Sequence, residues 1–91
     1  MIFIYDIIKD EHNKEKHKIS FEEAQRIWND PNLIVLPAKR RGEKRKLAIG
    51  RYYTITLSVI FTEREKAIRI ISTRRATAKE VKYYDQHKDK K

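Results

Sequence analysis

The segment from Ile55 to Thr62 alternates between larger apolar and small, mostly hydroxylated side chains, and this pattern constrains the fold most strongly. Successive side chains of a β-strand point to opposite faces of the sheet. One face of the predicted strand therefore carries Ile55, Leu57, Val59 and Phe61, and the other carries Thr56, Ser58, Ile60 and Thr62. We expect the first face to cover the core and the hydroxylated face to be available for a ligand.

Other segments predict the elements around this strand. Residues 2–8, 33–37, 45–52 and 67–73 are rich in β-branched and aromatic side chains and are typical of strands, with a tight hairpin at 63–66. A charged segment predicts a short helix over 9–17. Capping boxes at Ser20–Glu23 and Thr77–Glu80 predict helices that run to Pro31 and to about His87.

The predicted order β-α-α-β-β-β-β-α segregates strands from helices, which indicates the α+β class. We expect an antiparallel sheet with the helices packed on one face. A chain of 91 residues is long enough for one modest core. Residues 1–91 are therefore predicted to form a single domain, with a frayed tail at about 87–91.

The charge of the chain is strongly asymmetric. Residues 1–38 carry five Lys or Arg against seven Asp or Glu, whereas residues 39–91 carry 17 against six, and the formal net charge is +9. Such asymmetry favours a polyanionic partner, nucleic acid first and an anionic membrane surface second, although solvated surface charge is the simpler explanation. No apolar run approaches a membrane span, the N-terminus lacks the features of a signal peptide, and cysteine is absent. These features predict a soluble cytoplasmic protein.

Several chemistries lack support in the sequence. The five-residue spacing of His12 and His17 does not suit a paired ligand site on a helix, so we expect no metal and no cofactor. Gly42 and Gly50 are the only glycines, which excludes a glycine-rich phosphate loop. The serines show no recognisable acid–histidine pattern for a nucleophilic triad.

Arginines in or beside the predicted strands are the strongest candidates for a functional site. Guanidinium groups on a rigid strand suit phosphate oxygens. Strand parity groups Arg69 with Thr73 and Arg75, and Ser72 with Arg74. The alternative is an ion-pair network with nearby glutamates, which are too few to pair every arginine. The candidate phosphate-binding side chains are Arg45, Arg69, Arg74 and Arg75.

RNA cleavage without a metal needs a base, an acid and cations that stabilise the pentacoordinate phosphate. The arginines supply the cations. His17, between two lysines, is the best-placed acid–base candidate, although it is equally compatible with a solvated surface position. Tyr83 and Tyr84 could stack on bases or donate a proton, or pack the last helix onto the sheet.

Three separated motifs resemble the BrnT family of type II toxins. They are KHKISFEEAQRIWNDP at 16–31, GEKRKLAIG at 42–50 and VIFTEREKAIRIISTRRATAKEVKYY at 59–84, and the resemblance covers roughly residues 3–84. Lys18 stands where the family usually has glycine, so a helix cap that tolerates positive φ is expected to be lost or moved.

The resemblance implies a RelE-like α+β fold and a metal-independent endoribonuclease that inhibits translation and arrests growth. It also implies neutralisation by a cognate BrnA-like antitoxin with a ribbon-helix-helix region, through which alone the complex would contact operator DNA and repress its operon. No membrane partner is expected. Matching of the motifs gives as catalytic candidates Lys16, His17, Arg45, Arg69, Arg74, Arg75 and Tyr84. The cations expected to bind RNA are Lys39, Arg40, Arg41, Lys44 and Arg51.

Two rival interpretations remain open at this point. The basic face could belong to a non-catalytic nucleic-acid-binding module that grasps phosphates without cleaving them. It could also serve chiefly to hold an acidic antitoxin segment, which is compatible with a toxin whose active face is covered by its inhibitor.

Overall fold

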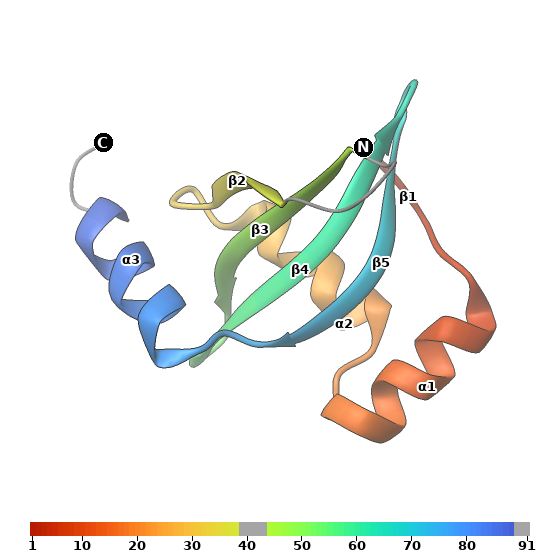
Figure 1. Ribbon diagram of the computed structural model, residues 1–91, viewed down its shortest axis with the longest axis horizontal. Helices are drawn as coiled ribbons and strands as arrows, with labels where there is room; N and C mark the ends of the chain where they lie inside the picture. The colour runs from red at the N-terminus through yellow and green to blue at the C-terminus, as the bar shows by residue number, and fades with distance from the viewer. Residues whose placement is uncertain (39–43, 89–91) are drawn as a thin grey trace.

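A five-stranded sheet forms the centre of the molecule, with helices on both sides (Figure 1). The computed structural model describes residues 1–38 and 44–88. The elements in chain order are β1 (Ile2–Ile4), α1 (Ile7–His17), α2 (Phe21–Ala24), the 3₁₀ helix η1 (Gln25–Asn29), β2 (Ile34–Ala38), β3 (Arg45–Tyr52), β4 (Ile55–Arg64), β5 (Ala67–Arg75) and α3 (Ala78–Lys88). The predicted α+β class is confirmed.

The sheet is mixed, which corrects the expectation of an antiparallel sheet. The strand order is β1-β5-β4-β3-β2, and β1 runs parallel to β5 while the other neighbours are antiparallel. A short hairpin cannot join parallel strands, so the chain from β1 passes through α1 and the rest of the fold before β5 pairs with it. The predicted hairpin at 63–66 is confirmed, since β4 ends at Arg64 and β5 begins at Ala67.

The alternation in β4 separates two faces as predicted. We name the first face by Leu57, Val59 and Phe61, which are almost completely buried in the core with Phe21 and Ile27 from α2 and η1. The second face carries the other β4 side chains, Thr56, Ser58, Ile60 and Thr62. The core therefore lies between the first face and the α2–η1 segment.

The helices lie on both faces, which corrects the expectation that they pack on one. α2 and η1 cover the first face and α1 packs beside β5, whereas α3 lies across the second face, where Glu80 accepts a hydrogen bond from Ser58 (Figure 1). The second face is therefore covered by α3 around Ser58. Only its other half, toward Thr62 and β1, is free of helices among the described residues.

The N-terminal helices differ from their predicted bounds for local reasons. Asp6 caps α1 by accepting from the N–H groups of Ile8 and Lys9, so the helix begins at Ile7 and the first strand is shorter than expected. The predicted helix after Ser20 is split into α2 and the 3₁₀ segment η1. Its capping box with Glu23 is confirmed.

The docking of α1 depends on a buried polar side chain. Among its described residues only Asn13 is buried, and the Asn13 amide donates to the carbonyl of Ile19 (3.0 Å) and accepts from the N–H of Thr73 (3.1 Å). Both bonds are needed because an unpaired buried amide is costly. They fix the helix along β5 and therefore fix the position of its last turn, which carries Lys16 and His17.

Candidate nucleic-acid interface

The arginine at the end of β5 is held by a carboxylate from α3. Arg74 donates two parallel hydrogen bonds to the two oxygens of Glu80, at 2.7 and 3.0 Å. The same carboxylate accepts from Ser58 Oγ (2.9 Å) and from the N–H of Thr77 (2.9 Å), which completes the predicted capping box. The planar fork of Arg74 is thus already occupied by a carboxylate that is itself fixed at two further points.

The surroundings of Glu80 stabilise its charged form. The hydrogen bonds from Arg74 lower the pKa of Glu80 to about 2, against the opposing effect of burial, and the Thr77 and Ser58 donors add to the lowering. The same pair raises the pKa of Arg74 above its usual value. At neutral pH the pair is therefore fully ionised, and it attaches the first turn of α3 to the sheet.

A second group of cations lies on the half of the second face that α3 leaves open. Thr62 pairs with Arg69 across β4 and β5. Arg45 precedes Lys46, which pairs with Phe61, so Arg45 is placed beside Thr62 on the other side. With strands roughly 4.8 Å apart, the two arginines stand roughly 10 Å from each other at their Cα atoms. We call Arg45, Thr62 and Arg69 the cationic row.

The hydroxyl at the middle of the cationic row is unusual. Thr62 is only 4% exposed, and its Oγ1 makes no hydrogen bond within the described part of the chain. A buried hydroxyl without a partner is costly, and such groups concentrate at functional positions. The row therefore places two arginines on either side of a buried hydroxyl that has no hydrogen-bond partner among the described residues.

A β-bulge in β5 corrects the predicted parity of the arginines. The register shifts between Ile60 and Phe61, so that Ile71 is the extra residue on β5. Arg69 therefore lies on the second face with Arg74, and it does not share a face with Arg75. An inserted residue reverses the alternation beyond it, which a count along the sequence cannot detect.

Arg75 and the Lys16–His17 pair lie at the other side of β5. Arg75 pairs with Leu57 and is exposed on the first-face side. His17 is half-buried and follows Asn13 by four residues, so both lie on the side of α1 that faces β5. Since α1 starts beside β1 and reaches Thr73 at Asn13, its last turn is directed toward the end of β5 that carries Arg75 (Figure 1). Lys16 is exposed.

The cap that follows His17 is present, contrary to expectation. Lys18 itself adopts the left-handed conformation, with φ 61° and ψ 27°, and its N–H donates to the carbonyl of Lys14 (2.8 Å). Lysine takes this conformation less readily than glycine. The presentation of His17 is therefore kept at a cost in backbone energy.

Tyr84 lies away from β5 and is locked to the corner between η1 and β2. Its hydroxyl donates to Asp30 Oδ2 at 2.5 Å, and the side chain is 2% exposed. Burial, with the Asp30 carboxylate next in effect, raises the pKa of Tyr84 to about 12. Asp30 also accepts from the N–H groups of Asn32 and Arg51. This geometry favours an anchoring role for Tyr84.

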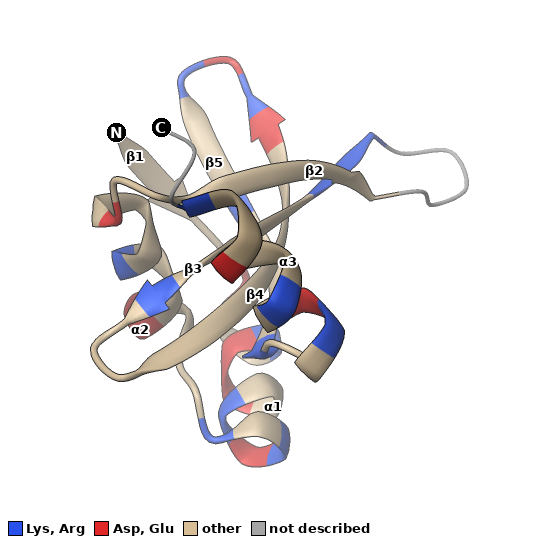
Figure 2. Ribbon diagram, turned by 90° about the vertical axis from the view of Figure 1, so that its left-hand side faces the viewer, with Lys and Arg blue, Asp and Glu red and all other residues tan. Residues whose placement is uncertain are grey.

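The remaining RNA-binding candidates occupy the two ends of β3. Lys44 is exposed and leads into the strand beside the cationic row, and Arg51 is exposed at the opposite end, where it donates to the carbonyl of Thr54. Basic residues accordingly mark both ends of β3 in Figure 2. The other three candidates, Lys39, Arg40 and Arg41, lie outside the described residues.

A comparison with known protein families assigns the chain to a family. The family model described as the ribonuclease toxin BrnT of type II toxin–antitoxin systems matches residues 5–80, most of the chain. The chain belongs to the BrnT family. No curated protein matches it. None of the helices formed by the described residues is long and apolar enough to cross a membrane.

Family membership implies a ribonuclease toxin with an RNA target and an antitoxin partner. The structure divides the candidate residues of this BrnT-family chain between two places. Arg45, Arg69 and Arg74 lie on the second face, whereas Arg75 and the Lys16–His17 pair lie toward the first. Tyr84 belongs to neither group, since its hydroxyl is directed to Asp30.

The sequence offered the ion pair of Arg74 with Glu80 only as the alternative to phosphate binding, and it did not predict the roles of Asp30 and Thr62. The pairing of Arg74 with Glu80 follows from the capping box, which places Glu80 six residues after Arg74 at the start of α3, and that signal was present in the sequence. The role of Asp30 as a shared acceptor had only a weak signal, its place before Pro31 at the end of a helix. The unpaired Thr62 had none, because its burial depends on tertiary packing.

Proposed function

We propose that the chain is a metal-independent endoribonuclease toxin that cleaves messenger RNA in the cytoplasm, inhibits translation and arrests growth. Family membership supplies the ribonuclease class. The observation that carries the proposal is the cationic row, in which Arg45 and Arg69 flank the unpaired hydroxyl of Thr62 on an open half of the sheet. Phosphate oxygens suit the guanidinium groups of the two arginines, while the Thr62 hydroxyl is buried between the strands that carry them.

The path of the RNA follows from the edges of β5. β1 pairs only with Ala67–Arg69, so beyond Arg69 the outer edge of β5 has no strand neighbour among the described residues. α1 packs against this part of the edge through the Asn13–Thr73 hydrogen bond, so an RNA strand bound at the cationic row is proposed to pass around the end of β5 to the first-face side. There it meets Arg75, to which the last turn of α1 is directed. The scissile phosphate is proposed to lie at this end of β5.

The reaction needs no group beyond the protein and the RNA. The 2′-oxygen forms a bond to the adjacent phosphorus, and the bond from phosphorus to the 5′-oxygen breaks. The proton of the 2′-hydroxyl passes to a base, and an acid protonates the departing 5′-oxygen. The products are a 2′,3′-cyclic phosphate and a 5′-hydroxyl, and the arginines stabilise the charge that accumulates on the phosphate.

His17 fits the acid–base role best among the three candidates. It is half-buried and its helix turn is directed toward Arg75, and histidine changes its charge near neutral pH. Lys16 is an exposed neighbour that favours phosphate binding. Tyr84 fits least, since its hydroxyl is buried, bound to Asp30 and raised in pKa to about 12.

Arg74 has a different role in this proposal. Its fork is occupied by Glu80, and a phosphate would have to compete with a carboxylate that is fixed by Ser58 and Thr77. We assign Arg74 to positioning, since it holds α3 and the end of β5 together. The basic residues Lys39, Arg40, Arg41, Lys44 and Arg51 are proposed to lengthen the RNA-binding surface.

The regulation proposed for this chain follows the resemblance of its motifs. The toxin would be neutralised by a cognate BrnA-like antitoxin with a ribbon-helix-helix region. The complex would repress its own operon, with operator DNA contacted only through the antitoxin. A RelE-like fold is compatible with the α+β architecture and remains part of the proposal.

Cleavage of a defined single-stranded RNA in EDTA tests the proposal. We expect 2′,3′-cyclic phosphate ends, and no cleavage of an RNA with a 2′-deoxy substitution at the susceptible position. Arg69→Ala should reduce the cleavage rate by roughly 10- to 100-fold, because a charge-assisted phosphate contact is worth about 1.5–3 kcal/mol. His17→Ala should lower the rate while RNA affinity is kept. Lys82→Ala, which removes an exposed cation from α3, is the matched control. Intact RNA with folded wild-type protein would refute the proposal.

A non-catalytic RNA-binding module is the second candidate. Two hydrogen-bonding groups assigned to chemistry by sequence, the Arg74 fork and the Tyr84 hydroxyl, are engaged by Glu80 and Asp30. Binding of RNA with steep salt dependence but no turnover would favour this candidate. Turnover, rather than salt dependence, separates the two.

A further inference from the structure

An exposed apolar surface lies at the N-terminal edge of the sheet. Within the described part of the chain, most of the exposed large apolar side chains fall in the first eight residues. They are Met1, Ile2, Ile4, Ile7 and Ile8. Clustered exposed apolar side chains mark interaction sites far more often than scattered ones. We call β1 and these five residues the N-terminal edge.

The backbone of this edge is open to a further strand. β1 is the terminal strand of the sheet and pairs only with β5 on its inner side. Its outer N–H and C=O groups have no strand partner among the described residues. An unpaired strand edge is a template for an added strand, and pockets beside it give the addition its specificity.

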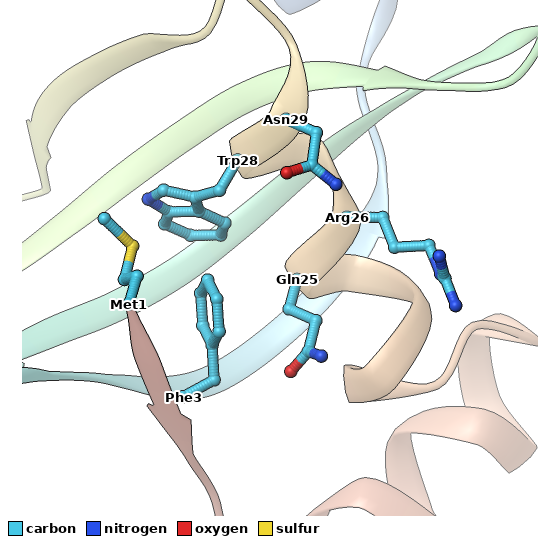
Figure 3. A pocket seen from close by; sticks show the side chains of 6 residues that line it. All are labelled: Met1, Phe3, Gln25, Arg26, Trp28 and Asn29. Carbon is cyan, nitrogen blue, oxygen red and sulfur yellow. The ribbon is translucent and has the colours of Figure 1, made fainter.

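A hollow beside the edge can receive a side chain from such a strand. It measures about 390 Å³ and is lined by Met1, Phe3, Gln25, Arg26, Trp28 and Asn29. Figure 3 shows the rings of Phe3 and Trp28 between Met1 on one side and the amides of Gln25 and Asn29 on the other. The two rings meet edge to face at 5.2 Å, so the apolar wall is well formed.

The charges around the edge are mixed, but more of the cations than of the carboxylates lack an ion-pair or hydrogen-bond partner among the described residues. Arg26 stands at the rim of this hollow, and Arg64 and Lys66 line a smaller one of about 170 Å³ on the other side of Met1. Of the carboxylates nearby, Glu63 is paired with Lys46 and Asp6 caps α1, while Glu65 is exposed. A partner with acidic side chains among its apolar ones therefore fits this surface.

We propose that the N-terminal edge is the docking site of the antitoxin. An extended antitoxin segment with apolar and acidic residues adds as a sixth strand beside β1, with one apolar side chain in the Phe3–Trp28 hollow. Its acidic side chains pair with Arg26, Arg64 or Lys66. That the partner is an antitoxin rests on family membership and on the proposed toxin function.

The position of Ile4 connects this docking site to inhibition. Ile4 lies opposite Arg69 in the register of β1 and β5, and both flank the open half of the second face. An acidic residue that follows the docked strand reaches Arg69 and competes with phosphate at the cationic row. The antitoxin thereby blocks RNA binding from the edge of the sheet, without displacing α3.

The test compares matched substitutions on the two terminal strands. Ile4 on β1 and Val35 on β2 are 42% and 44% exposed. Ile4→Lys should weaken the affinity for the purified product of the adjoining reading frame by about 10- to 30-fold in calorimetry, as for loss of an interface contact worth about 1.4–2 kcal/mol. Val35→Lys should change it less than about 3-fold. Thermal unfolding checks that both variants fold.

Hydrogen exchange on the wild-type complex supplies a measurement that needs no substitution. We expect residues 2–4 to become protected when the partner binds. Protection confined to β2 or α3, or equal losses for the two variants, would overturn the proposal. A wild-type chain that dimerises through β1 in light scattering would assign the edge to a second copy instead. RNA cleavage is measured separately: Ile4→Lys should cleave like the wild type, and inactive wild-type protein would refute the ribonuclease proposal without affecting the binding result.

Discussion

The two faces of the sheet are held by different kinds of interaction. The first face is packed against α2 and η1 through buried apolar side chains such as Phe21, Ile27 and Leu57. The attachment of α3 includes several polar contacts: Glu80 binds Arg74 and Ser58 on the second face, and the buried Tyr84 donates to Asp30 at the corner between η1 and β2. The first kind of contact depends on shape and area, and the second depends on charge state. The difference indicates that the core and the α3 attachment can be perturbed separately.

Removal of a large core side chain should produce the largest effect. Phe21 is fully buried and meets the ring of Tyr5 edge to face at 5.4 Å. We expect Phe21→Ala to lower the free energy of unfolding by about 3–5 kcal/mol in urea denaturation, because it leaves a cavity. Loss of structure should be global, in α3 as well as the core. Phe21→Leu, which leaves less of a cavity, should cost less, and selective loosening of α3 by Phe21→Ala would contradict the comparison.

Acidification should loosen α3 while the core remains folded. Because Arg74 holds the pKa of Glu80 at about 2, below the 4.5 of an unperturbed glutamate, the contribution of this pair is complete above pH 4.5 and is lost as the pH falls toward 2. Hydrogen exchange of 78–88 should accelerate in this window before the exchange of β4 does.

Glu80→Gln is the matched control for that titration. The variant should already show faster exchange in α3 at pH 7, with a loss of about 1–2 kcal/mol in local stability since Arg74 remains partly open to water. The acceleration of α3 exchange that the wild type shows between pH 4.5 and 2 should be absent in this variant. An unchanged acid transition would mean that other carboxylates control α3.

A smaller effect is expected at the end of α1, which belongs neither to the packing of α2 and η1 on the first face nor to the attachment of α3. Lys18→Gly relieves the left-handed conformation, with φ 61°, and should raise the free energy of unfolding by about 0.5–1 kcal/mol. Since α1 docks on β5 through Asn13, the gain should appear in global unfolding and leave the α3 exchange pattern unaltered. Lys14→Gly, in the helix interior, should have the opposite sign.

The sequence predicted the features that depend on local patterns. The alternation in β4, the two capping boxes and the β4–β5 hairpin each involve neighbouring residues, and each is confirmed. The family was also recognisable, since its motifs are stretches of sequence.

The features that escaped prediction depend on contacts between distant segments. The parallel pairing of β1 with β5 joins residues 2–4 to residues 67–69, and strand propensity does not specify a neighbour. The position of α3 is decided by Ser58 and Asp30, which come from elements far along the sequence. The catalytic residues themselves stay a prediction. Because the candidates lie in two groups on the two sides of β5, substitutions can test each group separately.

The extra residue at Ile71 has a consequence for comparing members of this family. On the second face, β5 carries odd-numbered residues before Ile71 and even-numbered residues after it. A relative that keeps the same number of residues but forms a regular strand without the bulge would carry Arg74 on the first face and Arg75 on the second, with every arginine still present. Alignment of the arginines alone would then equate side chains that work on opposite sides of the sheet.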